Sequence, residues 1–210
     1  MSIKNQVSSS DAPKRLSMVD FLAASDQAGS FAKGCRFFVR INPGGNVIRS
    51  YPNDIGYMCE AVELPGRGFA LGHTRYYGPE QVFPINTEYQ PITVSVLCRA
   101  DSRERRFFDD WLDYINPINT FNFQYPDTYQ CEINIYQYAD YAGEGNTTAY
   151  PPAMASASKS WKPKVTYHWQ LRKAWPTLVN AQPVNWSEQD VLRLQVSFAY
   201  KYWDRPDYAP

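Results

Sequence analysis

Hydrophobic and polar residues alternate most regularly near the end of the chain, in VLRLQVSFAYKYWDRP at positions 191–206. Because successive side chains of a strand point to opposite faces, this alternation sorts them into two rows. The apolar row contains Leu192, Leu194, Val196, Phe198, Tyr200 and Tyr202, and the polar row contains Arg193, Gln195, Ser197 and Lys201. A strand from Val191 to Tyr202 would be about 40 Å long, about twice the usual length. We therefore predict one long strand with an apolar and a polar face.

Six other segments have the composition of β-strands, because Val, Ile and aromatic residues favour strands while Gly, Pro and Asn favour the turns between them. These predicted strands cover residues 35–41, 47–51, 55–64, 92–99, 129–138 and 164–175. The sequence Pro43-Gly44-Gly45-Asn46 predicts a turn between the first two. In the last one, apolar residues occupy the odd positions from Val165 to Leu171.

One amphipathic helix is predicted over residues 101–115, DSRERRFFDDWLDYI, which Asn116-Pro117 would end. Apolar residues recur there at the spacing of one helix face. The residues expected to anchor this face in the core are Phe107, Phe108, Trp111 and Ile115, with Leu112 beside them. The opposite, charged face carries Arg103, Arg106, Asp109, Asp110 and Asp113. Asp101 and Glu104 match a capping box for the first turn.

The remaining segments predict extensions of a single folded domain over residues 35–204. Residues 1–34 form a polar arm in which Ser17 could cap a short helix. Residues 65–91 are rich in Gly and Pro at their start and predict a long functional loop. Residues 139–160 predict a loop insertion, and residues 205–210 form a C-terminal tail.

The fold class that accommodates these elements is mainly β. We expect an antiparallel β-sandwich or barrel of six to seven strands with the helix 101–115 between two of them, because antiparallel sheets allow one polar face. No repeat of the solenoid or propeller kind is visible.

The composition narrows the function classes. Lys plus Arg and Asp plus Glu both number 21, so the chain does not have the basic balance of a protein that grips nucleic acid through its surface charge. The sequence has no apolar run of 18 residues and its first residues do not match a signal peptide. We therefore expect no membrane span and a protein that stays in the cytoplasm where it is made.

No pattern of catalytic or metal-binding residues emerges. The cysteines Cys35, Cys59, Cys98 and Cys131 are scattered, and we expect reduced thiols packed in strands. His73 and His168 have no Cys or Glu at ligand spacing, and no phosphate loop or nucleophile motif occurs. We expect no enzyme activity, no metal site and no cofactor.

Three segments occur in an order that carries a family resemblance. CEAVELPGRG (59–68) precedes a long loop with YYGP (76–79), and YQPITVSVLCRADSRERRFFDDWLDYI (89–115) follows. The chain then closes with KAWPTLVNAQPVNWSEQDVLRLQVSFAYKYWD (173–204). This order, with the helix motif from Phe108 to Trp111, resembles the tail tube proteins of contractile-tailed bacteriophages over roughly residues 35–204. The N-terminal arm and the insertion are longer than the minimal tube fold requires.

The resemblance implies a virion protein of the tail, assembled in the host cytoplasm, whose hexameric rings stack into a hollow tube. Its partners would be further copies of the chain, the tail sheath and baseplate proteins, and phage DNA would pass through the lumen without sequence-specific binding. The strand residues expected to face the lumen or a neighbouring subunit are Arg193, Gln195, Ser197 and Lys201. The residues of loop 65–91 expected to contact the adjacent ring are Arg67, Phe69, Tyr76, Tyr77 and Phe83.

Three alternatives stay open. A tube initiator of the baseplate shares the fold, and so does the secreted tube protein of bacterial type VI systems. From a different class, an aromatic-rich β fold could bind carbohydrate through exposed rings. Most aromatic residues here follow the apolar row of a strand or helix, as Phe107, Trp111 and Tyr167 do, which favours assembly over sugar binding.

Overall fold

The computed structural model describes residues 32–42, 54–142, 163–187 and 189–206. Predictions about the helix near Ser17, the turn 43–46, the strand 47–51 and most of the insertion 139–160 lie outside these residues. Apart from residues 139–142 and 163–164, the elements discussed below belong to one compact unit, formed by Arg36–Tyr138 and Val165–Pro210.

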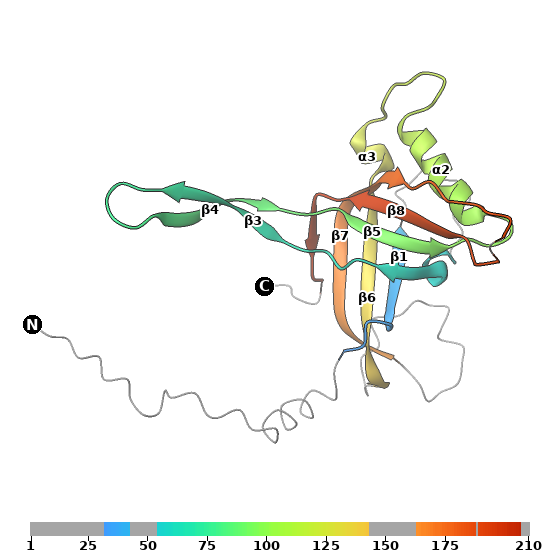
Figure 1. Ribbon diagram of the computed structural model, residues 1–210, viewed down its shortest axis with the longest axis horizontal. Coiled ribbons are helices and arrows are strands. Elements are labelled where there is room, and N and C mark those ends of the chain that lie inside the picture. The colour runs from blue at the N-terminus through green and yellow to red at the C-terminus, as the bar shows by residue number, and fades with distance from the viewer. Residues whose placement is uncertain (1–31, 43–53, 143–162, 188, 207–210) are drawn as a thin grey trace, which may run out of the picture. The chain divides into compact units, whose positions relative to one another are not determined.

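The fold is mainly β with one long helix, as predicted. A seven-stranded sheet has the order β1–β6–β7–β8–β5–β2, with β9 paired to β7, and β3 and β4 form a separate two-stranded sheet (Figure 1). The elements are β1 (Phe37–Asn42), η1 (Ile55–Met58), β2 (Cys59–Val62), β3 (Gly68–Thr74), β4 (Gln81–Glu88), β5 (Ile92–Leu97), α2 (Arg103–Ile115), α3 (Pro126–Tyr129), β6 (Cys131–Ala142), β7 (Pro163–Val179), β8 (Arg193–Ala199) and β9 (Tyr202–Asp204).

The core lies between the inner sides of the sheet and the apolar face of α2. Alternating Ile and Val residues of β5 and β6 supply one part of it, since β-branched side chains pack well on a pleated surface. Trp111 and Phe108 of α2 are fully buried, and both rings contact the ring of Phe198 on β8, with centroids 6.1 Å apart. Burying these aromatic rings fixes the helix on the sheet.

The segment 55–64, predicted as one strand, contains a 3-10 helix followed by a short strand. The helix η1 packs against β1 so closely that a Cβ on Gly56 would lie 2.2 Å from the carbonyl oxygen of Val39. Only glycine fits at that distance, and Ile55 beside it is buried. The backbone therefore turns into a helix here because it covers the core beside β1.

The predicted long strand from Val191 to Tyr202 is wrong. β8 and β9 are separate strands, interrupted at Tyr200 and Lys201, and the backbone N–H of Lys201 donates to the carbonyl oxygen of Arg172 at 3.1 Å. Within β8 the predicted alternation holds, because Leu194, Val196 and Phe198 are fully buried while Arg193 and Gln195 are exposed.

The cause of the interruption lies in the neighbouring strand, β7. Residues 170–172 of β7 pair with β9, and residues 175–179 pair with β8. Between these stretches Lys173 has a φ of 56°, which is uncommon for a residue with a side chain. The buried positions change there from odd (Leu171) to even (Ala174). Both members of the antiparallel pair therefore bend at the same place.

The helix α2 begins differently from the prediction. Its first turn follows Ser102, which has a φ of 51° and makes no capping hydrogen bond through its side chain. Glu104 is fully buried and binds Arg99 instead of the N-cap backbone, so the capping box predicted for Asp101 and Glu104 is wrong. The charged residues predicted for the opposite face are exposed, and Asn116 ends the helix as predicted.

Candidate functional site

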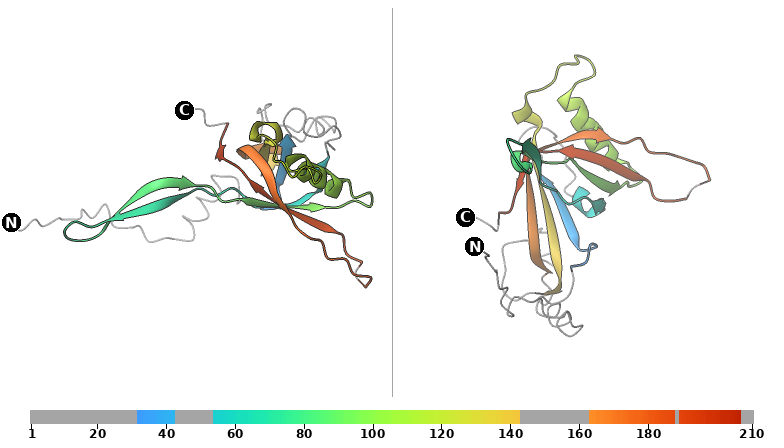
Figure 2. Two further views of the ribbon diagram at one scale, coloured as in Figure 1. Left: turned by 90° about the horizontal axis from the view of Figure 1, so that it is seen from above. Right: turned by 60° about the vertical axis from the view of Figure 1, so that its left-hand side comes forward.

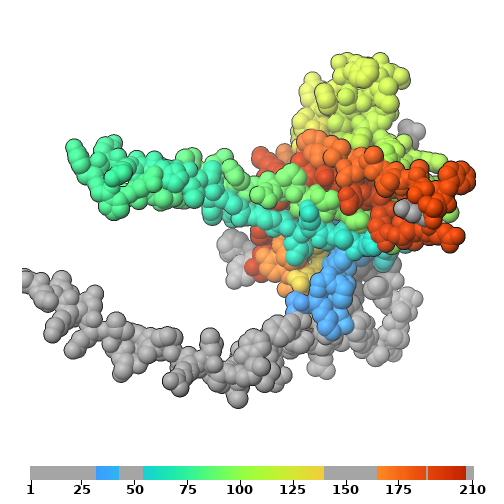
Figure 3. All heavy atoms as spheres, viewed as in Figure 1, coloured from blue at the N-terminus to red at the C-terminus, as the bar shows by residue number. Residues whose placement is uncertain are grey.

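The β3–β4 hairpin replaces the long loop predicted over residues 65–91. It extends away from the strands of the main sheet as a narrow projection (Figures 1, 2 and 3). Its large exposed apolar side chains are Phe69, Leu71, Tyr76, Tyr77, Val82, Phe83 and Ile85. A two-stranded hairpin has no core of its own and is only marginally stable alone, and a contiguous exposed apolar surface marks an interaction site. We therefore treat the hairpin as the candidate assembly surface.

The glycine in the middle of the hairpin allows its apolar side chains to pack on one another. Gly72 pairs with Phe83, and a Cβ added to Gly72 would lie 2.7 Å from Ile85 Cδ1 and 2.8 Å from Phe83 Cζ. Those two side chains thus lie across the backbone of Gly72, which is buried although the hairpin is exposed. The register shifts between Ala70 and Leu71, which bends the hairpin locally.

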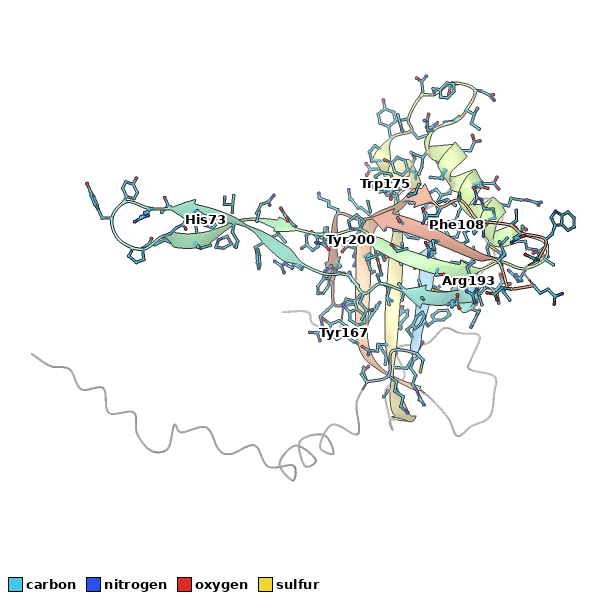
Figure 4. The ribbon with its side chains drawn as sticks, in the orientation of Figure 1. His73, Phe108, Tyr167, Trp175, Arg193 and Tyr200 are labelled. Atoms are coloured by element: carbon cyan, nitrogen blue, oxygen red, sulfur yellow. The ribbon has the colours of Figure 1, made fainter. Side chains whose placement is uncertain are left out.

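The tip of the hairpin is held by short-range polar contacts. His73 Nδ1 lies 3.2 Å from Glu80 Oε1, and Arg75 Nε donates to the carbonyl oxygen of Gly78 at 3.1 Å. Gly78 has a φ of +89°, a backbone conformation that favours glycine. Between these contacts Tyr76 and Tyr77 are 89% and 98% exposed. The fixed turn therefore presents two tyrosine rings to the surroundings; His73 marks this end of the hairpin in Figure 4.

The root of the hairpin is tied to the body of the fold. Trp203 Nε1 on β9 donates to the carbonyl oxygen of Gly66 at 3.3 Å. The guanidinium carbon of Arg67 lies 5.5 Å from the ring centroid of Phe69 in a cation–π contact. Because β2 leads into β3 and β4 leads into β5, the hairpin continues two paired strands of the main sheet.

The structure brings all five predicted ring-contact residues onto this one hairpin or its root, and Arg67, Phe69, Tyr76, Tyr77 and Phe83 are exposed. The prediction missed Leu71, Val82 and Ile85 because it treated the segment as a loop. The alternation in FALGHT and in QVFPINTE would have revealed two strands, although Gly72 and Pro84 interrupt it.

The predicted helix anchors Phe107, Phe108, Trp111 and Ile115 are buried in the core. The indole Nε1 of Trp111 donates to the carbonyl oxygen of Tyr129 at 3.1 Å, which connects α2 to the end of α3. These residues support the sheet and have no surface to offer a partner.

The predicted lumen or neighbour residues divide into two groups. Arg193, Gln195 and Ser197 lie on the outward face of β8, opposite its buried positions. Lys201 lies in the interruption between β8 and β9 and is exposed. Arg193 has two carboxylate partners, since its Nε is 2.8 Å from Glu60 Oε2 and its Nη1 is 2.8 Å from Asp190 Oδ2.

Two further exposed apolar patches were not predicted. The segment between α2 and α3 exposes Ile118, Phe121, Phe123 and Tyr125. The segment between β7 and β8 exposes Val184 and Trp186, and the indole ring of Trp186 is fully accessible. Both lie in loops where no periodicity indicates a buried side, so the sequence offered no signal for them.

The ionisable groups of the described residues give no sign of a catalytic centre. The described residues contain no group of His, Cys, Asp and Glu that could hold a metal ion. His168 stacks on Tyr136 with ring centroids 4.3 Å apart, and its Nε2 lies 2.9 Å from Asn134 Oδ1, which gives it a structural role. Burial raises the pKa of the Cys59 thiol to about 12 and raises that of Cys131 further.

All four cysteines are free, but Cys35 is exposed, contrary to the prediction of four packed thiols. Cys131 is buried in the core, and Cys59 and Cys98 are half-buried. Among the helices that the structure describes, none has the length and apolarity to cross a membrane.

Comparisons with solved structures show a shared fold at low sequence identity. A chain of the anti-feeding prophage baseplate superposes with a TM-score of 0.55 at 12% identity, over 84% of this chain and 96% of that one. A chain of the sheath–tube complex of an extracellular contractile injection system, PVC, has a TM-score of 0.53 at 12% identity, over 90% and 97%. A chain of the tube-terminating cap of the anti-feeding prophage has a TM-score of 0.51 at 14% identity, over 83% and 90%.

Sequence comparison with families is more specific. No curated protein matches the chain. The family model described as "Phage tail tube protein" matches residues 34–205, which include every described element from β1 to β9. The chain therefore belongs to the phage tail tube protein family.

Proposed function

We propose that this chain is the repeating subunit of the inner tube of a contractile phage tail. Six copies close into a ring, rings stack into a tube, and phage DNA passes through the lumen. The tail sheath surrounds the tube and the baseplate starts it. Closing a ring pairs sheet edges that a single subunit leaves open, and such edges otherwise promote uncontrolled association.

The observation that supports this proposal best is the β3–β4 hairpin. It is a projection whose large apolar side chains remain exposed even where they pack on one another, as Phe83 and Ile85 do across Gly72. Covering them against an adjacent ring would remove this apolar surface from water. Interface energy concentrates in aromatic side chains, and the tip presents Tyr76 and Tyr77.

Deleting the hairpin between Gly72 and Phe83 tests the proposal. Negative-stain electron microscopy of the intact protein over a concentration series is expected to show six-fold rings and stacked tubes. The deletion variant is expected to stay folded and soluble, and to form rings without tubes. Normal tubes from the deletion variant would contradict the inter-ring role of the hairpin.

A baseplate tube initiator of the same fold is the second candidate. A chain of the anti-feeding prophage baseplate has a similar fold, and this similarity is the support for the second candidate. An initiator would form single rings that do not stack on their own and would add once to the end of a tube. The same concentration series therefore separates the two candidates.

A further inference from the structure

The outward face of the strands β2, β5 and β8 consists mainly of small uncharged side chains. Ala61, Ser95 and Gln195 lie opposite one another across the three strands, and Thr93 lies opposite Ser197 in the next row. The alternate positions of β5 and β8 face the core, so these residues point away from it.

The cation on this face is neutralised on both sides. Arg193 binds Glu60 Oε2 and Asp190 Oδ2, each at 2.8 Å, and its place on β8 is labelled in Figure 4. The hydrogen bond from Arg193 holds the pKa of Asp190 below its ordinary value, so this carboxylate is ionised at neutral pH. A third carboxylate, Glu63, accepts a hydrogen bond from the backbone N–H of Thr93 at 2.8 Å. The guanidinium of Arg193 is thus paired with two carboxylates, and Glu63 is a further carboxylate of this face, beside Thr93.

Among the described residues, the outward face of β1, β6 and β7 carries one paired and one unpaired guanidinium. Arg172 of β7 binds the carboxylates of Glu132 and Asp204. On β1 the exposed Arg40 alternates with the buried Val39 and Ile41, and within the described part of the chain Arg40 has no ion pair. A guanidinium without a carboxylate is well suited to bind phosphate oxygens in a bidentate manner. Among the described strands, the β2–β5–β8 face has no guanidinium without a carboxylate partner, whereas the other face leaves Arg40 unpaired.

The direction of the hairpin connects this face with the stacking of rings. β2 and β5 are adjacent strands, and the hairpin is the continuation of both. If the hairpin reaches the adjacent ring, β2 and β5 run along the direction in which rings stack. Their outward face then continues from ring to ring.

We propose that the outward face of β2, β5 and β8 lines the channel, and that Glu60 and Asp190 clamp Arg193 so that a passing polyanion finds no cation to bind. The inference rests on the proposed tube function and adds which face meets the cargo. Nucleic acid is retained mainly by cations that displace its counterions, so each unpaired arginine, repeated by symmetry around and along a tube, would slow passage. By pairing with Arg193, the carboxylates of Glu60 and Asp190 remove a phosphate-binding site, and the outward surface of β8 stays polar.

Gold labelling tests which face lines the channel. Gln195→Cys is introduced together with Cys35→Ser, which removes the exposed native thiol, and the purified subunit is labelled with a maleimide gold cluster before assembly. Asp110→Cys, on the exposed face of α2, is the matched control for label position, also with Cys35→Ser. Cys35→Ser alone measures background labelling of the remaining thiols. Gold from Gln195→Cys is expected along the tube axis, and gold from Asp110→Cys along the outer edge. Gold from Gln195→Cys on the outer edge would overturn the assignment.

Charge-neutralising variants test the clamp itself. Glu60→Gln with Asp190→Asn frees Arg193, and Asp110→Asn with Asp113→Asn changes the net charge equally without freeing it. Anisotropy of a labelled short DNA duplex is expected to show affinity for the first variant about tenfold higher than for the second, with binding that weakens as salt rises. Adding Arg193→Ala to the first variant is expected to return the affinity to the control level. Equal affinities of the first variant and the control would overturn the clamp.

Different experimental results would refute the channel face and the proposed tube function. Tubes that form with gold outside refute the channel face and leave the tube role intact. Absence of rings from the intact protein at all concentrations refutes the tube role, whereas the anisotropy comparison still reports on Arg193 in dispersed subunits.

Discussion

The carboxylate of Glu104, which is fully buried, accepts one hydrogen bond from the backbone N–H of Arg99 at 3.1 Å and another from its Nε at 2.6 Å. The Nη1 of Arg99 also binds the carboxylate of Asp54. Arg99 follows β5, Glu104 lies in the first turn of α2, and Asp54 precedes η1. One arginine therefore joins three elements that enclose one side of the core.

Removing only one partner of this pair is expected to destabilise the fold more than removing both. Arg99→Ala would leave the Glu104 carboxylate buried without its cation, whereas Arg99→Met with Glu104→Leu replaces both charges by apolar groups. Urea denaturation is expected to give the single variant the lower midpoint. A double variant less stable than Arg99→Ala would contradict the role assigned to the buried carboxylate.

Acid is expected to weaken the interaction between Arg99 and Asp54 and so to destabilise the fold. The hydrogen bond from Arg99 is the main cause that holds the pKa of Asp54 below its ordinary value of 3.8. A carboxyl group with a lowered pKa in the folded state contributes stability that is complete above 3.8 and is lost as the pH falls through the folded-state pKa. Thermal melting below pH 4 is therefore expected to fall less steeply for Asp54→Asn than for the native chain. Parallel curves would show that Asp54 is not coupled to folding.

Trp111→Ala is expected to cost about 3–5 kcal/mol in the free energy of unfolding, because it removes a fully buried indole from the core. Trp111→Phe keeps a ring but loses the hydrogen bond to Tyr129, so it is expected to cost less. Chemical denaturation of the two variants measures both values. An unchanged midpoint for Trp111→Ala would mean that α2 does not pack on the sheet as described.

Tyr76→Ser with Tyr77→Ser is expected to abolish tube formation without lowering the melting temperature, because both rings are exposed at the hairpin tip. Sedimentation measures assembly and calorimetry measures the melting temperature. The matched control is Ile118→Ser with Phe123→Ser in the exposed segment after α2, which is expected to leave stacking unchanged. Tubes of normal length from the Tyr76 and Tyr77 variant would exclude the tip as the joint.

Sequence periodicity predicted those elements whose surroundings are uniform along their length. The apolar row of β8 and the stripe of α2 face one core throughout, so the burial of Val196 and Trp111 follows from spacing alone. The break at Tyr200 and Lys201 could not be predicted in this way, since the alternation continues through it. The bend arises from the left-handed backbone of Lys173 in the neighbouring strand.

The hairpin shows the opposite difficulty. Gly72 and Pro84 are poor strand residues, and they made the segment resemble a loop. In the structure Gly72 is required because Phe83 and Ile85 lie across it, a contact that depends on pairing with the opposite strand. The residues proposed for ring contact nevertheless lie together on the exposed hairpin or its root, because aromatic residues beside glycines are conspicuous without knowledge of the pairing.

The uncovered apolar faces of the hairpin also determine how assembly should respond to temperature. Transfer of apolar surface out of water is driven almost entirely by entropy near room temperature, and it weakens on cooling. If Tyr77 and its apolar neighbours form the joint between rings, warming strengthens that joint while the hydrogen-bonded sheet within each subunit changes little. Chilled tubes would then shorten ring by ring, and each released subunit would keep its fold and be ready to stack again.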